Sequence, residues 1–258
     1  MLSLRFINLE KKGHITIISL ERPEKRNAIN LDTALELEKA VTSFELDDEA
    51  HVLILTGSAN VFCAGADLSD TERLSQRVLS ENGPLGFTRM NLSKPVIAAI
   101  SGYCVAGGFE AALWTDIRVA DETSVFGFLE RRFGVPLVDG GTQRLPLIAG
   151  LGRALDLILT GRTIDAKQAY EMGIVNYIVP AGKSLEKAME VAELISTFPQ
   201  ETLRNDRKSI FAGMSKYLSE GLKIEAEFGK SSIQKNGMDS VRLFQEGKGR
   251  SGKPVKID

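Results

Sequence analysis

Two runs of consecutive apolar residues constrain the fold of this chain more than any other feature. VLILT over 52–56 and VIAAI over 96–100 contain no charged side chain, and a glycine follows each run within two residues. A strand with one face in water alternates polar and apolar residues, whereas a parallel strand covered on both faces is apolar throughout. The two runs therefore predict buried parallel strands in a sheet that has helices on both faces.

Strand-like and helix-like patterns alternate on either side of these runs. HITIISL over 14–20 is rich in β-branched residues and predicts another strand. Apolar residues at helical spacing over 31–46 predict the first long helix. The other expected elements are helices over 107–114, 142–149, 153–159 and 166–172, and strands over 117–120, 124–129 and 174–179. This alternation is typical of an α/β fold.

The pattern changes near the C-terminus. From Leu185 onward the apolar spacing is helical, and Pro199 marks a joint in it. The chain has 258 residues, which is long for one domain of about 150 residues and short for two. We therefore expect an α/β core over 1–198 and a helical C-terminal region over 199–258.

Composition excludes several classes of function. Lys and Arg number 32 against 34 Asp and Glu, a net charge of −2, so the chain lacks the basic excess of a nucleic-acid-binding protein. No apolar run approaches the roughly 20 residues of a membrane span, and charges come too early for a secretory signal. Cys63 and Cys104 cannot form a disulfide framework, and no Cys/His cluster has metal-ligand spacing. We expect a cytoplasmic protein without metal, nucleic acid or membrane partner.

A glycine-containing turn follows each apolar run, over 57–68 and over 101–110. The first N–H groups of a helix that begins at such a turn have no intrahelical partner and lie at the positive end of the helix dipole. Glycine also allows a backbone to approach a ligand closely. Neither turn has the spacing of a phosphate-binding loop or a dinucleotide fingerprint. Such turns hold anions in some proteins and serve only as helix ends and close packing points in others.

The residues of these turns resemble the crotonase, or enoyl-CoA hydratase/isomerase, superfamily. The resemblance rests on FCAGADL over 62–68, IAAISGY over 97–103, GGFE over 107–110 and GGTQRLP over 140–146, with LTGR over 159–162 and RPEKRNA over 22–28. These segments follow one another in order along nearly the whole chain. The resemblance implies a spiral of repeated ββα units and a C-terminal helical region that forms trimers, which often pair into hexamers.

The same resemblance implies an acyl-CoA thioester substrate whose enolate oxygen is held by the backbone N–H groups of Ala66 and Gly107. Fixed dipoles directed at developing charge need no reorganisation, and loss of one such donor costs about 3–4 kcal/mol. No cofactor is implied, because coenzyme A is part of the substrate. The residues implied to line the coenzyme are Lys25, Arg26, Ala28, Ala64, Gly65, Asp67 and Leu68. For Lys25 and Arg26, solvated loop cations are an equally open interpretation.

Acidic side chains decide which reaction an enolate site performs, because they supply and remove protons. Glu110 lies in the first helical turn after Gly107, and Glu130 falls where the hydratases of this family have their second glutamate. The resemblance implies that Glu110 activates water and that Glu130 supplies the α-proton. The alternatives are complementation of the helix dipole by Glu110 and a surface ion pair of Glu130 with Arg131 or Arg132.

Asp139 is a departure from the familiar hydratases, which have no acid at its place. Dienoyl-CoA isomerases of the superfamily have an aspartate near there. Two interpretations stay open: Asp139 caps the helix that follows it, or it faces the acyl chain of the substrate and moves a proton there.

The expected activity is reversible hydration of 2-trans-enoyl-CoA to 3-hydroxyacyl-CoA. The alternatives are an enoyl-CoA or dienoyl-CoA isomerase and a non-catalytic relative that binds RNA or acts as a scaffold. Retention of both Glu110 and Glu130 and the acidic composition argue against the non-catalytic alternative.

Overall fold

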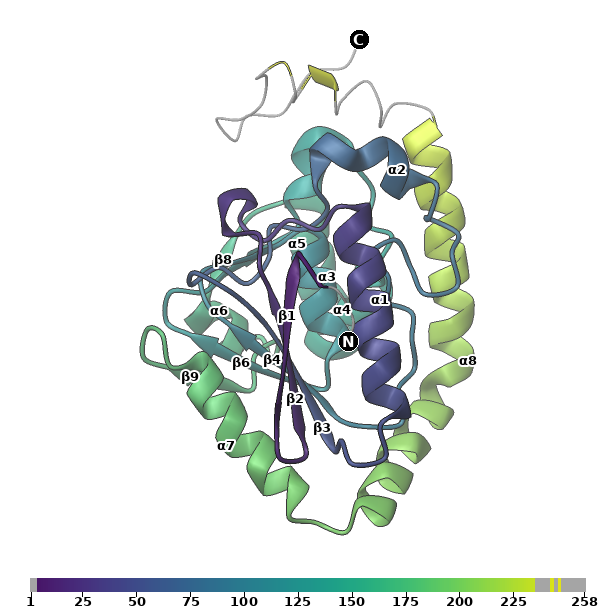
Figure 1. Cartoon of the computed structure of the whole chain (residues 1–258). Coiled ribbons are helices and arrows are strands. Elements are labelled where there is room, and N and C mark those ends of the chain that lie inside the picture. Colours follow the sequence, from purple (N-terminus) through teal and green to yellow (C-terminus); the bar gives the residue numbers. More distant parts are fainter. Residues whose placement is uncertain (1–3, 235–241, 244–245, 247–258) are drawn as a thin grey trace.

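The computed structural model of the chain describes residues 4–234, 242–243 and 246 (Figure 1). The rest of the expected C-terminal region, residues 235–241, 244–245 and 247–258, lies outside the described residues. Within the described part, no helix combines the length and the apolar composition that crossing a membrane would need.

A six-stranded sheet forms the centre of the fold. Its strands lie in the order β1-β2-β3-β4-β6-β9, where β1 is antiparallel to β2 and every other neighbouring pair is parallel. The strands are β1 Ile7–Lys12, β2 Ile15–Leu20, β3 Val52–Gly57, β4 Val96–Ile100, β6 Ile117–Asp121 and β9 Tyr177–Val179. The two apolar runs are β3 and β4 at the middle of this sheet, and their side chains are buried as predicted.

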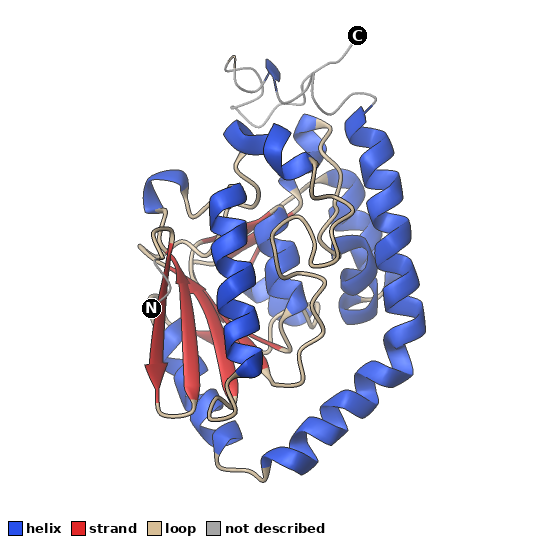
Figure 2. Ribbon diagram, turned by 45° about the vertical axis from the view of Figure 1, so that its right-hand side comes forward, coloured by secondary structure: helices blue, strands red, loops and turns tan. Residues whose placement is uncertain are grey.

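Helices cover both faces of the sheet (Figures 1 and 2). Leu53 of β3 belongs to a core cluster with α1 (Leu31–Leu46) and α3 (Gly107–Trp114) on one face. Its neighbour Ile54 belongs to a second cluster with α7 (Ser184–Ser196) on the other face. Because adjacent strand residues point to opposite faces, this double covering explains why the two runs are apolar throughout.

A second, three-stranded sheet brings the second glycine turn into place. Its order is β5-β7-β8, with β5 over Tyr103–Val105, β7 over Val125–Gly127 and β8 over Ile164–Asp165. β5 begins three residues after the end of β4 and leads directly into α3. The turn between the sheets therefore places the start of α3 beyond the carboxyl end of β4.

The remaining helices surround this core. They are α2 Thr71–Ser75, α4 Gly141–Ala149, α5 Leu151–Thr160, α6 Ala166–Glu171 and α8 Gln200–Ser232, with short 3-10 helices η1 Pro23–Lys25, η2 Leu68–Asp70 and η3 Leu129–Phe133. α8 spans 33 residues and runs along the molecule in contact with α4 (Figure 1).

The predicted α/β fold with C-terminal helices is confirmed, whereas two strand predictions extend too far. The strand expected over 124–129 ends at Gly127, and a 3-10 helix begins at Leu129. The strand expected over 174–179 begins only at Tyr177, where pairing with β6 starts. The strands β1, β5 and β8 were not predicted, because β1 is mostly polar and exposed and the other two have only three and two residues. Where a strand begins and ends depends on its pairing with neighbouring strands, which the spacing of apolar residues in the sequence does not show.

Candidate active site

The two glycine turns lie against each other. Cys63 N donates to Tyr103 O at 2.9 Å, and Val105 N donates to Cys63 O at 3.0 Å. A Cβ atom at Gly65, which has a φ of +90°, would lie 2.7 Å from Gly107 N. Only glycine combines this dihedral with so close an approach. The structure therefore brings together the two segments that the sequence singles out.

The amides of Ala66 and Gly107 lie close together, and among the described residues neither has a backbone partner. Ile29 N donates to Gly65 O and Asp67 N donates to Ile29 O, so the Ala66 N–H points away from Ile29. Gly107 is the first residue of α3 and has no intrahelical acceptor. A Cβ atom at Gly107 would lie 3.5 Å from Ala66 N. In the described part of the chain neither amide donates to a protein acceptor, so two unpaired N–H groups stand at the contact between the glycine turns, as the oxyanion-site prediction requires.

Ala106 fixes the direction of the second amide. Its φ of 54° and ψ of −134° fall in a region that costs a residue with a side chain about 1–3 kcal/mol. Ala106 N donates to Gly127 O at 2.9 Å, which holds this conformation against the second sheet. Strained backbone of this kind is more frequent at functional sites. No sequence pattern predicted it at Ala106. The buried side chain of Leu85 packs next to Gly107.

Glu110 is buried in α3 and is held by a turn of the chain far from it in sequence. Its Oε1 accepts from Gly141 N at 2.8 Å and from Asp139 N at 3.0 Å. Burial, followed by the charges of Glu225, Asp139 and Glu130, raises the pKa of Glu110 well above its ordinary value. The Gly141 N–H opposes this shift. A carboxyl group of this kind exchanges protons near neutral pH more readily than an exposed one.

Glu130 is also buried, and one of its carboxyl oxygens is unsatisfied. Oε2 has no hydrogen-bond partner among the described residues. Burial raises the pKa of Glu130 to about 8. The alternative of a surface ion pair is wrong, because Glu130 is buried, with only 6% of its surface exposed. The site therefore contains two buried carboxyl groups whose charges interact.

Asp139 is buried between this pair and the segment before β4. Its Oδ1 accepts from Leu85 N and from the Thr88 hydroxyl. Burial raises the pKa of Asp139, and the Thr88 hydroxyl opposes the rise. The helix-cap interpretation is wrong, because the residue at the start of α4 is Gly140 and no side chain of its own caps the helix. The other interpretation, that Asp139 faces the acyl chain, stays a prediction.

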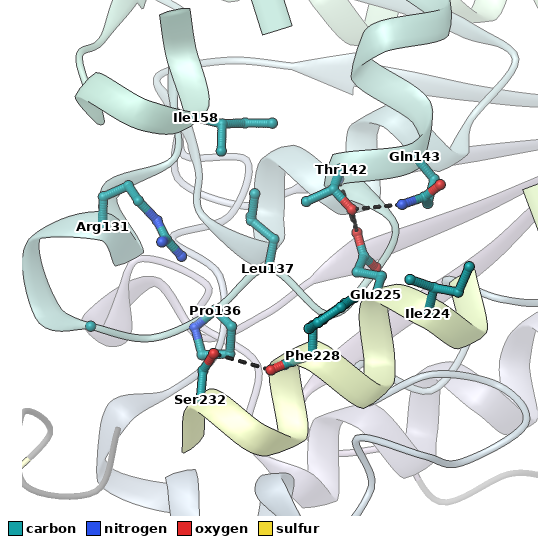
Figure 3. Close-up of a pocket in the computed structure, with 12 residues that line it drawn as sticks. Arg131, Pro136, Leu137, Thr142, Gln143, Ile158, Ile224, Glu225, Phe228 and Ser232 are labelled. Atoms are coloured by element: carbon teal, nitrogen blue, oxygen red, sulfur yellow. Dashed lines mark hydrogen bonds between the residues drawn. The ribbon is translucent and has the colours of Figure 1, made fainter. Parts of the chain in front are cut away.

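Glu110, Glu130, Asp139 and Glu225 form a cluster of buried acidic side chains. The sequence analysis missed one of them, Glu225. It comes from α8, and Figure 3 shows its carboxylate directed at Thr142. Oε2 accepts from Gly140 N at 2.7 Å, and Oε1 accepts from Thr142 N at 2.9 Å and from the Thr142 hydroxyl. One signal was available: Glu225 stands midway between Gly221 and Gly229 on one helix face.

The loop expected to bind coenzyme A lies beside the first glycine turn. Ala64 N donates to Arg26 O at 3.0 Å, and Ala28 is buried next to it. The side chains of Lys25 and Arg26 are exposed, and the Arg26 guanidinium lies 5.2 Å from the centre of the Tyr103 ring. These two cations therefore stand on the surface next to the amide pair, which leaves both interpretations of them possible.

Asp67 has a different place from the one expected of a coenzyme-lining side chain. Its carboxylate accepts from Arg22 Nη2 at 2.8 Å and from Ser69 N at 3.0 Å. Both partners of the Arg22–Asp67 ion pair are buried. The side chain thus fixes the start of η2, at Leu68, and its carboxylate is taken up by contacts within the protein.

A cavity of about 320 Å³ adjoins the acidic cluster (Figure 3). Thr142 and Glu225 belong to its wall, whereas Glu110, Glu130 and the two free amides do not. Its apolar wall comes from the loop before α4, from α5 and from α8, through the side chains Pro136, Leu137, Ile158, Ile224 and Phe228. The cavity therefore lies on the α8 side of the cluster.

The arrangement suits one kind of chemistry. Two free amides can stabilise an oxyanion, and buried carboxyl groups with raised pKa values can move protons beside it. In the described part of the chain no group of three or more His, Cys, Asp or Glu side chains is arranged to hold a metal ion. Cys63 and Cys104 are fully buried, and burial raises the pKa of the Cys63 thiol to about 12, so neither is suited to nucleophilic attack.

Comparisons with known proteins agree with this chemistry. Residues 10–250 match the family model described as enoyl-CoA hydratase/isomerase. The chain is 34% identical over 251 residues to mevalonyl-coenzyme A hydratase of Aspergillus fumigatus, a match that covers 95% of this chain and 93% of that protein. It is 36% identical over 246 residues to crotonyl-CoA hydratase of Syntrophomonas wolfei, with 93% and 95% covered. The solved structure of EchA1_1 from Mycobacterium paratuberculosis superposes with a TM-score of 0.86 at 28% identity, covering 97% and 98%. The chain belongs to the enoyl-CoA hydratase/isomerase family.

Proposed function

We propose that this protein is a hydro-lyase that reversibly adds water to 2-trans-enoyl-CoA thioesters and forms 3-hydroxyacyl-CoA. The observation that carries the proposal is the pair of free amides at Ala66 and Gly107, with Glu110 and Glu130 buried and electrostatically coupled beside it. Relatives at 34–36% identity are named short-chain-enoyl-CoA hydratase and crotonyl-CoA hydratase, which supports the same reaction for this chain.

The two glutamates divide the proton transfers. Glu110 has one oxygen fixed by two N–H groups. These donors stabilise its carboxylate form against the rise in pKa that burial causes, and its other oxygen accepts a proton from water. The hydroxide equivalent adds to the β-carbon, and the thioester oxygen takes up negative charge at the amides of Ala66 and Gly107. Glu130, with its unsatisfied Oε2, delivers a proton to the α-carbon. The glutamates titrate as a coupled pair.

The coenzyme portion of the substrate lies along the first glycine turn in this proposal. The exposed Lys25 and Arg26 meet its phosphates, where charge-assisted hydrogen bonds are strong. The backbone of Ala64, Gly65 and Leu68, together with Ala28, lines the pantetheine. Asp67 supports this segment through Arg22 and does not contact the coenzyme. No further cofactor takes part.

One observation favours a second candidate, an enoyl-CoA or dienoyl-CoA isomerase. Asp139 is buried beside Glu110, and burial raises its pKa. A third carboxyl group with this property can move a proton at a carbon further along the acyl chain. The two candidates give different products from the same type of substrate.

The assembly and the cellular place belong to the same proposal. Exposed apolar side chains lie on α5 and α8, among them Leu151 at 66%, Leu159 at 72% and Ile210 at 63% exposure. Such residues are typical of a subunit interface, and we propose a homotrimer, or a hexamer of two trimers, in which the 199–258 region joins subunits to the 1–198 core. The two unpaired cysteines are compatible with the cytoplasm.

The test is a hydration assay with crotonyl-CoA. The absorbance of the conjugated thioester should fall when purified protein is added, and 3-hydroxybutyryl-CoA should appear. The variant Glu227→Gln, on the exposed side of α8, serves as a control and should retain full activity. If no short, long or branched enoyl-CoA is hydrated while a double bond migrates along the chain, the isomerase candidate replaces the hydratase.

A further inference from the structure

Four consecutive backbone N–H groups at the start of α4 are shared between two buried carboxyl groups. The N–H groups of Asp139 and Gly141 donate to Glu110, at 3.0 and 2.8 Å. The N–H groups of Gly140 and Thr142 donate to Glu225, at 2.7 and 2.9 Å. The donors alternate, so the turn is held from both sides at once: by α3 through Glu110 and by α8 through Glu225.

The face of α8 that carries Glu225 is shaped to reach this turn. A Cβ atom at Gly221 would overlap Gln143 Oε1, and a Cβ atom at Gly229 would overlap Val138 Cγ1. These glycines stand four residues before and four residues after Glu225, on the same helix face. Glycine costs stability inside a helix, and here it lets the backbone of α8 approach the segment on both sides of the turn. Glu225 is only 5% exposed as a result.

We propose that Glu225 is a positioning residue for Glu110, through which the C-terminal helix fixes the water-activating carboxylate of the active site. The inference rests on the proposed function, in which Glu110 activates water. Glu225 does not contact the reacting atoms. It acts through the Gly140–Gly141 peptide, because the N–H of Gly141 reaches Glu110 only while the neighbouring amides are held on the other side.

The geometry explains why this residue is a glutamate. Its two oxygens accept from two amides that are two residues apart and from the Thr142 hydroxyl. A glutamine would keep the acceptor facing Thr142 but would place an NH₂ group against the Gly140 N–H, which is itself a donor. Gly140 precedes the first residue of α4, so no intrahelical acceptor replaces the lost one. The turn would relax on the side away from Glu110, and Glu110 would lose its fixed orientation.

The experiment compares Glu225→Gln with Glu227→Gln in the full-length protein. Glu227 is two residues further along α8 and exposed, so the control makes the same chemical change on the same helix. We expect amide hydrogen exchange at residues 139–142 to rise about 10-fold in Glu225→Gln and to stay unchanged in the control. With crotonyl-CoA, kcat should fall about 10-fold or more, with KM within roughly twofold, because orientation and not binding is lost.

The outcomes separate this inference from the proposed function. Faster exchange at 139–142 in a protein whose wild type hydrates no enoyl-CoA would refute the function and keep the mechanical link. Unchanged exchange and unchanged kcat in Glu225→Gln would overturn the inference. A rise in KM with kcat preserved would overturn it too, since it would assign Glu225 to substrate binding. If Glu225→Gln does not fold, Glu225→Asp keeps the charge and shortens the reach by one methylene. It should then shift exchange and kcat in the same direction by about threefold, and unchanged values would again refute the inference.

Discussion

Glu110 and Glu130 are both buried glutamates of the acidic cluster, yet their carboxyl oxygens differ in the hydrogen bonds that they accept. Glu110 has one oxygen held by two backbone N–H groups. Glu130 has an oxygen with no partner among the described residues. Two N–H donors favour the ionised form of a carboxyl group, whereas an unsatisfied buried oxygen favours the protonated form. Burial raises the pKa of both groups, and the hydrogen bonds to Glu110 oppose that rise, in keeping with the base and acid roles that we propose for Glu110 and Glu130.

This difference shows that backbone N–H groups, and not the type of side chain, distinguish the surroundings of the two glutamates. The two donors of Glu110 come from the turn before α4, which Glu225 holds from the other side. No N–H group among the described residues donates to Oε2 of Glu130. Burial raises the pKa of Glu130 to about 8. The fold therefore gives two buried glutamates, both with a pKa raised by burial, different hydrogen-bond surroundings.

Removal of either carboxyl group should have the largest effect. Glu110→Gln removes the acceptor of the water proton, and Glu130→Gln removes the donated proton, so each should lower kcat by roughly 10²–10⁴-fold. Because the two act as a unit, the double variant should be scarcely slower than the worse single variant. Steady-state kinetics with crotonyl-CoA measures all three. Full additivity of the two losses would show that the glutamates act independently.

Displacement of Glu110 without a change in its chemistry should have the next largest effect. A Cβ atom at Gly141 would lie 2.9 Å from Glu110 Oε1 and 3.2 Å from Phe128. Gly141→Ala should therefore lower kcat about 10- to 100-fold, since small misplacements of a catalytic group are costly. Gly213→Ala, at a helical position with nothing within 4 Å of the added atom, is the matched control. Equal kcat values in the two variants would mean that the orientation of Glu110 is unimportant.

The pH dependence of kcat tests the acid assignment of Glu130. A group with a raised pKa is protonated below that value and loses its proton as the pH rises through it. Glu130 has a pKa of about 8, so kcat should be lost as the pH rises above about 8, by roughly tenfold per unit. Kinetics in buffers between pH 6 and pH 10 reveals this limb. An activity that stays level to the top of that range would remove Glu130 as the proton donor.

The smallest effect should come from substitution of Arg131, the residue that follows Glu130. The positive charge of Arg131 lowers the pKa of Glu130 against the effect of burial. Arg131→Gln should therefore move the alkaline limb to higher pH, by about 0.2–0.5 unit because Arg131 is exposed to solvent. Arg132→Gln, the same change one residue along, should leave the limb in place. A shift to lower pH in Arg131→Gln would contradict the placement of the charge beside Glu130.

Much of the fold and half of the site could be predicted from sequence. The apolar runs of β3 and β4 predicted the centre of the sheet, because burial on both faces leaves a composition that periodicity detects. The resemblance predicted Ala66, Gly107, Glu110 and Glu130, and the structure places all four in adjoining segments. The strained backbone of Ala106 was not predictable, because sequence patterns do not report dihedral angles at a non-glycine residue.

Glu225 and the contacts of Asp139 were the parts of the site that sequence reasoning did not predict. Glu225 follows Gly140 by 85 residues, and its partner amides carry no side-chain signal. For Asp139 the sequence left a helix cap and a position facing the acyl chain open, and it did not predict that the carboxylate accepts from Leu85 N and the Thr88 hydroxyl. Contacts between segments this far apart depend on how α8 and the loop before β4 pack, and tertiary packing overrides local preference at such positions.

A crystal structure of the protein with bound acetoacetyl-CoA is the most direct test of the central claim. The account predicts that the thioester oxygen lies about 3 Å from both Ala66 N and Gly107 N, with the carbons of the acyl chain between Glu110 and Glu130. A thioester oxygen that contacts neither amide, or only one of them, would contradict the account.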